Sequence, residues 1–219
     1  MSKFEIARRN MIDGQIRPNK VTEDRLIAAM ARLPRELFVP AAARAFAYVD
    51  EDIDIGGGRY LMEPMVLARL LQAAAITPNE VVLEIGSGSG YGLAVLASLG
   101  NTAVGIEQDE ALVKAATATL AEAGIDNTAV IEGDLKRGYP TQAPYPVIVF
   151  AGAVDQVPVE IHQQLSDGGR LLAVINSTGQ GTGQATLIRR HGDHFARTDL
   201  FDAATPYLPG FAPAPAFVF

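Results

Sequence analysis

Apolar runs and helical spacings alternate through the second half of the chain. Short apolar runs with the length and β-branched content of buried strands occur at residues 81–85, 102–106, 128–131, 147–150 and 170–175. Apolar residues at helical spacing separate several of these runs, at residues 91–98, 109–123 and 158–165. This alternation predicts an α/β fold with a doubly wound, mostly parallel sheet.

The first third of the chain has a helical pattern instead. Apolar spacing predicts helices at residues 2–11 and 22–33, the second with Thr22 as its N-cap and acidic residues in its first turn. Pro34 ends that helix because a proline does not continue the backbone hydrogen bonding. A short helix is also expected at residues 40–46.

A glycine triplet and a proline divide the segment that leads into the first strand. Residues 56–58 are all glycine and predict a flexible loop. Residues 63–75 predict a further helix with Pro64 in its first position, where the missing amide costs nothing.

Two more strands and a Pro-rich segment close the chain. The pattern at residues 186–190 and 195–201 predicts a terminal antiparallel hairpin. The tail from residue 206 to residue 219 is rich in proline and aromatic residues. We expect it to be extended and to pack on the body of the protein.

The strand at residues 81–85 leads into a glycine-rich turn with acidic residues on both sides. Gly86, Gly88 and Gly90 allow a ligand to approach the main chain, and the first amides of the following helix are unsatisfied donors. Glu84 precedes the turn, and Glu107 lies at the tip of the next strand, where an acid can accept hydrogen bonds from both ribose hydroxyls. The alternative interpretation is that the turn is only a tight corner.

The spacing within the turn narrows the choice of nucleotide. A dinucleotide fingerprint would need a glycine at position 91, which is Tyr91, and no P-loop signature is present. No basic residue within the turn is available for a phosphate. An adenosine without phosphates fits best, and this favours S-adenosylmethionine. Asp134 follows the third apolar run, where it either accepts from the adenine amino group or caps the next helix.

Composition restricts the class of protein further. The chain has 219 residues, 48% hydrophobic content and a net charge of −7, which argues against nucleic acid as the main partner. It has no cysteine, so disulfides and a thiol nucleophile are excluded, and a cytoplasmic location is expected. We expect no signal peptide, because the segment MSKFEIARRN is polar, and no membrane partner, because no apolar run reaches membrane-spanning length. His191 and His194 are interpreted as solvated surface, and no metal site is expected.

Several motifs together resemble the protein-L-isoaspartate O-methyltransferase family, a family of class I S-adenosylmethionine-dependent methyltransferases. The resemblance extends over about residues 10–176 and is carried by MIDGQIRP, LPRELFVP, AYVDEDIDIGGG, VLEIGSGSGY, EGDLKRGYPTQAPYPVIVFAGA and QLSDGGRLLAVI. The Pro-Arg-Glu-x-Phe-Val-Pro signature at residues 34–40 makes it narrower than a general methyltransferase pattern.

The resemblance implies a fold and a set of site residues. It implies one methyltransferase domain over residues 1–219, with a helical cap and acceptor-site loop at 1–76, a cofactor-binding sheet at 77–205 and a Pro-rich tail at 206–219. Glu107 is expected to bind the ribose, Asp134 the adenine, and Glu84 to shape the pocket at the methionine end. The expected cofactor-binding residues are Glu84, Gly86, Ser87, Gly88, Gly90, Glu107, Gln108, Gly133, Asp134 and Leu135.

The acceptor-site loop departs from the family pattern. Aligned without gaps, the family segment Gly-Gln-Thr-Ile-Ser-Gln-Pro falls on residues 58–64, which read GRYLMEP. Met62 stands at the serine position and Tyr60 at the threonine position, so a hydroxyl that would bond the substrate carboxylate is replaced by a thioether. Arg59 either pairs with a carboxylate in its place or is an exposed loop residue. The expected substrate pocket is therefore Arg59, Tyr60 and Met62, and no catalytic residue is assigned.

The resemblance also implies a reaction and a partner. The expected activity is methyl transfer to the carboxylate of L-isoaspartyl and D-aspartyl residues in damaged proteins, for repair. Two alternatives stay open, a different small-molecule acceptor with the same cofactor, and a homologue that binds S-adenosylmethionine without turnover. Other departures are Leu135, Pro146, a longer loop at residues 176–184 and the sequence TPYLPGF near the C-terminus. The oligomeric state is not predicted.

Overall fold

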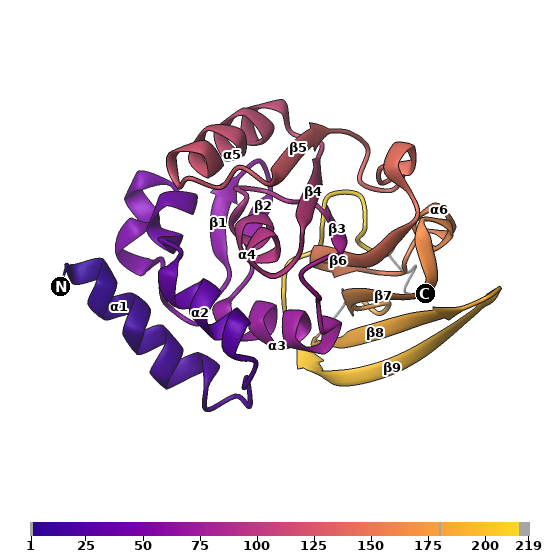
Figure 1. Cartoon of the computed structure of the whole chain (residues 1–219), viewed down its shortest axis with the longest axis horizontal. Coiled ribbons are helices and arrows are strands. Elements are labelled where there is room, and N and C mark those ends of the chain that lie inside the picture. The colour runs from indigo at the N-terminus through magenta and orange to yellow at the C-terminus, as the bar shows by residue number, and fades with distance from the viewer. Residues whose placement is uncertain (1, 180, 215–219) are drawn as a thin grey trace, which may run out of the picture.

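A central sheet organises the protein (Figure 1). The computed structural model describes residues 2–179 and 181–214, and within them the sheet has seven strands in the order β5-β4-β3-β6-β7-β8-β9. The strands are β3 (Val81–Ile85), β4 (Thr102–Glu107), β5 (Thr128–Glu132), β6 (Tyr145–Val154), β7 (Leu165–Ile175), β8 (Gly183–His191) and β9 (His194–Ala203). Neighbouring strands pair in parallel from β5 through β4, β3 and β6 to β7, whereas β8 pairs antiparallel with both β7 and β9. The predicted doubly wound sheet and terminal hairpin are confirmed.

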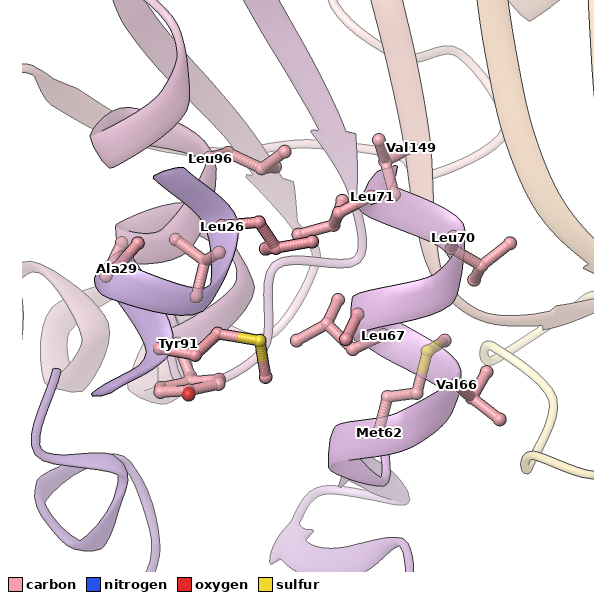
Figure 2. Close-up of a cluster of buried hydrophobic side chains, with 14 of the residues drawn as sticks. Leu26, Ala29, Met62, Val66, Leu67, Leu70, Leu71, Tyr91, Leu96 and Val149 are labelled. Atoms are coloured by element: carbon pink, nitrogen blue, oxygen red, sulfur yellow. The ribbon is translucent and has the colours of Figure 1, made fainter. Parts of the chain in front are cut away.

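Helices cover one face of the sheet and form most of the core. They are α3 (Pro64–Ala74), α4 (Tyr91–Leu99) and α5 (Glu110–Glu122), with α2 (Asp24–Arg32) packed outside α4. Figure 2 shows Leu71 of α3 pointing toward Leu26 of α2, with Leu96 of α4 and Val149 of β6 nearby. Pro64 occupies the first position of α3, as predicted.

The second face of the sheet is covered by short segments. The helix predicted at residues 158–165 is shorter than expected: α6 spans Val159–Gln163. It ends early because Leu165 already pairs with Tyr145 in the sheet, and Tyr145 N donates to the carbonyl of Gln164 at 2.7 Å. Leu208 and Phe211 from the C-terminal segment are buried against this face. The tail therefore packs on the body through Leu208 and Phe211, and residues 215–219 lie outside the described chain.

The N-terminal cap is helical, and its helix α2 packs against both α3 and α4. Helix α1 (Lys3–Met11) begins with a capping box and continues into a π-helical turn, Ile12–Ile16. The prediction of Thr22 as the N-cap of α2 is wrong, because Glu23 takes that role and accepts from Leu26 N at 2.9 Å. The amide of Thr22 instead donates to Gln72 Oε1 at 2.6 Å. The short helix expected at residues 40–46 is a 3-10 helix, Ala41–Phe46, and another spans Arg35–Phe38.

The glycine triplet lies in a hairpin, which corrects the prediction of a flexible loop. Strands β1 (Ile53–Gly56) and β2 (Arg59–Leu61) pair in antiparallel fashion, and Gly57 and Gly58 form the turn between them. Positive φ angles of 60° and 69° at these two residues explain why glycine occupies the turn. The described residues contain no helix of the length and apolar character needed to cross a membrane.

Candidate active site

The glycine-rich turn lies at the carboxyl end of β3, where the strand passes into α4. The amides of Gly86 and Ser87 both donate to the carbonyl of Ile106, at 2.8 and 3.1 Å, so the turn is bonded to the end of β4. Gly90 has a φ of 90° and forms the N-cap of α4. The parallel register pairs Ile85 with Ile106 and therefore brings Glu107 beside the turn.

Glu107 is fully buried, and both of its carboxylate oxygens accept hydrogen bonds. Oε2 accepts from Gly88 N at 2.9 Å, and Oε1 accepts from Gln108 N at 2.8 Å and Asp109 N at 3.3 Å. Oε2 also accepts from Arg59 Nε at 3.0 Å, in an ion pair that is almost wholly shielded from solvent. Three backbone amides and a guanidinium thus satisfy both oxygens of this carboxylate.

Arg59 extends from β2 into the carboxyl edge of the sheet. It is 2% exposed, and its Nη2 donates to the carbonyl of Gly86 in addition to the contact with Glu107. The interpretation of Arg59 as an exposed loop residue is therefore wrong. The carboxylate with which it pairs belongs to the protein itself, 48 residues further along the chain.

Glu84 is a buried carboxyl group without a partner. It is 1% exposed, and neither of its oxygens has a hydrogen-bond partner among the described residues. A Cβ at Gly92 would lie 2.0 Å from Glu84 Oε1, so the missing side chain of this glycine makes the room for the carboxyl group. Burial raises the pKa of Glu84 to about 8, against the lowering effect of the Arg59 charge and together with the raising effect of Glu107. Burial without a hydrogen-bond partner thus favours the uncharged form of Glu84.

A narrow cleft joins the glycine turn to the acceptor-site segment. Its cavity volume is about 20 Å³. Its lining includes Tyr60 and Met62 from the hairpin side, and Glu84, Gly86, Ser87, Gly88 and Ser89 from the cofactor side. The structure thus brings together two sets of candidate residues that are more than twenty positions apart in the sequence. The hydroxyl oxygens of Ser87 and Ser89 are buried and have no hydrogen-bond partner within the described residues.

The remaining candidate cofactor residues lie along the same edge of the sheet. Gly133 N donates to the carbonyl of Glu107 at 3.0 Å, which places the end of β5 beside the end of β4. Asp134 is exposed, and its Oδ1 accepts from Lys136 N at 2.9 Å. It closes a turn and does not cap a helix, since only turns and the short 3-10 helix Pro140–Gln142 are described between β5 and β6. Leu135 is buried and Gln108 is exposed.

Arg35 supports the site and was missed as a functional residue from the sequence. It is fully buried, and donates from Nε to the carbonyl of Ala47 and from Nη2 to the carbonyl of Met62, both at 2.7 Å. Its guanidinium lies 4.8 Å from the ring centre of Tyr91, the first residue of α4. The sequence feature that could have identified it is the signature at residues 34–40, which contains Arg35. In the structure Arg35 connects the cap, the acceptor-site segment and the start of α4.

Two apolar side chains beside the glycine turn were also missed. An ideal Cβ at Gly88 would lie 2.9 Å from Ile55 Cδ1, and one at Gly86 would lie 2.6 Å from Leu208 Cδ2. Ile55 comes from β1 and Leu208 from the C-terminal segment. Neither position carries a local sequence signal, because each contact joins segments that are remote in the chain.

The parts of this edge fit an adenosine-containing cofactor. Gly86 and Gly88 keep the main chain of the turn free of side chains of its own, Glu107 offers a buried carboxylate, and Glu84 has unpaired oxygens in the cleft. A parallel sheet with a glycine turn after β3 and an acid at the tip of β4 defines a Rossmann-like methyltransferase of the S-adenosylmethionine-dependent class.

Known proteins narrow the class to a family. Residues 7–209 match the sequence model of the family described as protein-L-isoaspartate(D-aspartate) O-methyltransferase. A protein-L-isoaspartate O-methyltransferase of Herpetosiphon aurantiacus is 38% identical over 193 residues, which cover 88% of this chain and 85% of the relative. One of Koribacter versatilis is 36% identical over 220 residues, covering 98% of this chain and 97% of the relative. The chain belongs to the protein-L-isoaspartate O-methyltransferase family.

Solved structures agree with this assignment. A structure named protein-L-isoaspartate O-methyltransferase superposes with a TM-score of 0.82 at 25% identity, over 94% of this chain and 67% of that chain. A Plasmodium falciparum protein of the same description, in complex with S-adenosyl-L-homocysteine, superposes with a TM-score of 0.76 over 94% of this chain and 97% of its own. At 17% identity, the second comparison supports the fold alone.

Proposed function

We propose that this protein transfers a methyl group from S-adenosylmethionine to the carboxylate of L-isoaspartyl residues, and of D-aspartyl residues, in damaged proteins. The observation that carries the proposal is the cleft in which Tyr60 and Met62 of the acceptor-site segment meet Glu84 and the glycine turn. An acceptor bound to the hairpin side would thus lie next to a cofactor bound on the turn. Family membership supports the same activity.

The chain's own residues divide the binding of the cofactor between them. Glu107 would accept from the ribose hydroxyls, Asp134 would lie at the adenine, and Gly86, Ser87 and Gly88 would form the floor of the site. Gly90, Gln108, Gly133 and Leu135 complete the expected lining. Glu84 would lie at the methionine end, where its unpaired oxygens are available to an ammonium group. Bound there, the cofactor supplies a methyl group activated by a sulfonium.

The acceptor needs positioning more than activation. A carboxylate is already ionised at pH 7, so no strong general base is needed to remove a proton. The protein has to hold the carboxylate oxygen in line with the methyl group inside a dry pocket, and such orientation is worth about 7–11 kcal/mol. The burial of Met62, Leu61 and Ile55 around the cleft supports this exclusion of water. In the proposed repair the methyl ester cyclises spontaneously to a succinimide, which opens partly to normal aspartate.

The acceptor-site segment favours a second candidate, methylation of another small acid or phenol with the same cofactor. Met62 lacks the hydroxyl expected for carboxylate recognition, and Tyr60 adds an aromatic ring to the cleft lining.

We further infer that the partners are isoaspartyl proteins or peptides in the cytoplasm, with no nucleic acid and no membrane involved.

A labelling experiment tests these proposals. Radiolabelled methyl transfer to an isoaspartyl peptide and to its normal aspartyl twin is measured, with calorimetry of S-adenosylmethionine binding on the same preparation. Selective labelling of the isoaspartyl peptide is expected, and Glu107→Ala should lose both binding and labelling. Binding without labelling of either peptide would favour the second candidate, or a homologue without turnover, and a panel of small acids and phenols separates these two. Undiminished binding by Glu107→Ala would contradict the cofactor site.

A further inference from the structure

The carboxylate expected to bind the ribose already has its partners within the protein. Glu107 Oε2 is shared by Gly88 N at 2.9 Å and Arg59 Nε at 3.0 Å, while Oε1 accepts from the amides of Gln108 and Asp109. Two ribose hydroxyls would need acceptor positions on the same carboxylate. The ribose hydroxyls would therefore compete with Arg59, because its guanidinium is the only one of these four donors that belongs to a side chain and can move away.

Arg59 is held on the glycine turn itself and not only by Glu107. Its Nη2 donates to the carbonyl of Gly86 and lies 2.7 Å from where a Cβ on that glycine would be. Glycines at such a turn leave space for a ligand to lie against the main chain. In this chain the guanidinium of Arg59 occupies part of that space.

The hairpin that carries Arg59 closes over the turn along its length. Ile55 of β1 packs against Gly88, and a Cβ at Gly57 would lie 2.7 Å from Asp109 Oδ2 at the start of α5. The cleft that remains has a cavity volume of about 20 Å³, far below the roughly 300–1,000 Å³ of most ligand pockets. The β1–β2 hairpin thus covers the surface from the glycine turn to the carboxylate of Glu107, through Ile55, Gly57 and Arg59.

We propose that Arg59 is a latch that competes with the cofactor ribose for Glu107, so that S-adenosylmethionine binds only when the β1–β2 hairpin releases the turn. The latch rests on the proposed function, because it presumes that Glu107 is the ribose ligand. Part of the binding free energy is then spent on opening the hairpin, and the apparent affinity falls by the fraction of molecules that are open. Tyr60 and Met62 are neighbours of Arg59 on the same segment, so release of the latch also rearranges the acceptor side of the cleft.

Substitution of the latch residue separates this proposal from a purely structural ion pair. Arg59→Gln keeps a polar side chain but cannot form the ion pair, and glutamine is the residue that the family pattern has at this position. It is expected to bind S-adenosylmethionine at least about tenfold more tightly than the wild-type protein in isothermal titration calorimetry.

Arg170→Gln is the matched control. Arg170 also donates to a backbone carbonyl, that of Ala74 at 2.7 Å, and to a carboxylate, that of Glu80 at 2.7 Å. It pairs with Val147 of β6, which pairs in turn with Val82 near the amino end of β3, so it lies toward the opposite edge of the sheet from the glycine turn. Its loss should leave the affinity for S-adenosylmethionine unchanged.

The outcomes distinguish the latch from the proposed function. Equal or weaker binding by Arg59→Gln than by wild type would overturn the latch and leave the cofactor assignment standing. Absence of binding to the wild-type protein and to both variants would overturn both. Tighter binding by Arg59→Gln together with failure to methylate isoaspartyl peptides would support the latch and contradict only the choice of acceptor.

A second measurement uses only the wild-type protein, because removing one partner of a buried ion pair is often strongly destabilising and can prevent a variant from folding. Hydrogen exchange of the wild-type chain is followed with and without S-adenosylmethionine. The latch predicts faster exchange of the amides in residues 53–61 when the cofactor is bound, whereas the amides of the glycine turn become protected. Protection of both segments would overturn the latch.

Discussion

Single buried side chains decide the electrostatics of the cleft. Glu84 and Glu107 lie on neighbouring strands, yet one carboxyl group has no partner and the other accepts from three amides and a guanidinium. Burial without a hydrogen-bond partner raises the pKa of Glu84 to about 8. Two acids of the same type on neighbouring strands therefore have opposite hydrogen-bonding environments.

The state of Glu84 makes stability depend on pH in a defined window. Its folded pKa of about 8 lies above the ordinary value of 4.5, so the unfolded chain releases this proton at lower pH than the folded one. This group's contribution to the free energy of unfolding is fully present below about pH 4.5 and is lost as the pH rises to about 8, by at most about 1.4 kcal/mol per pH unit.

Glu84→Gln should remove this pH dependence. Because glutamine does not titrate, the stability of the variant relative to wild type is expected to increase steadily from pH 5 to pH 8. Urea unfolding across this range checks the prediction, and the difference between the two proteins cancels the groups that they share. Parallel stability curves would show that Glu84 is not held neutral by its surroundings.

Substitution of Met62 by the serine of the family pattern tests whether the acceptor-site segment has lost a contact with the substrate carboxylate. Met62→Ser places a hydroxyl where the family pattern has one, and a hydrogen bond to a charged group is worth about 1.5–3 kcal/mol. We expect kcat/KM for an isoaspartyl peptide to increase by about tenfold or more. Met65→Ser, at a half-buried position of α3 outside the cleft lining, serves as the control. A fall in isoaspartyl activity with Met62→Ser alone would contradict the inference that Met62 is a lost acceptor contact.

At the scale of elements, short connections hold the two halves of the site together. The 3-10 helix Arg35–Phe38 lies between α2 and the hairpin, and its Arg35 bonds the carbonyls of Ala47 and Met62 while it faces Tyr91 of α4. Phe38 makes an edge-to-face contact with the same Tyr91 ring at 5.6 Å. This signature segment therefore acts as a brace between the acceptor side and the glycine turn.

Removal of the brace should cost stability. Arg35→Met preserves much of the side-chain volume but leaves two buried carbonyl groups without their donor, at about 1–3 kcal/mol each. A loss of about 2–5 kcal/mol in the free energy of unfolding is expected by urea denaturation. The exposed Arg44, in the next 3-10 helix, is the control, and Arg44→Met should change stability by less than about 0.5 kcal/mol. Equal effects of the two variants would contradict the brace.

At the scale of the whole molecule, the two faces of the sheet are built differently. Three helices of nine to thirteen residues cover one face, whereas α6 and the C-terminal segment cover the other among the described residues. Leu208 and Phe211 are each 1% exposed, and Phe211 packs edge to face on Phe150 at 5.9 Å. The C-terminal segment is therefore part of the core, and through Leu208 it also reaches the glycine turn.

Truncation of Phe211 should show this role. Phe211→Ala is expected to destabilise the protein by about 3–5 kcal/mol, because the surrounding strands cannot fill the cavity. Phe46→Ala is the control, since Phe46 is 61% exposed and its loss leaves no buried cavity. Calorimetric unfolding of both variants decides the matter, and a stability of Phe211→Ala within 1 kcal/mol of wild type would mean that the tail is not part of the core.

Most of the sheet was predictable because strands and helices have their own local periods. The ranges expected for β3 and α4 differ from the structure by at most one residue, since a run of buried positions is visible in the sequence itself. The start of α2 and the length of α6 were not predictable, because Gln72 and Tyr145 decide them from elsewhere in the chain. Local patterns do not encode such partners.

The sequence by itself determined the alternating sheet, the glycine turn after β3 and the acids at positions 84 and 107, because each depends on neighbouring residues. Only the tertiary structure decided that Arg59 is buried on Glu107, that Arg35 braces Met62 against α4, and that Leu208 covers Gly86. The reason is physical: a side chain's partner is chosen by the packing of distant segments, and the free energy of burying a charge depends on that partner. The ligand site could thus be located from the chain, but its closure could not.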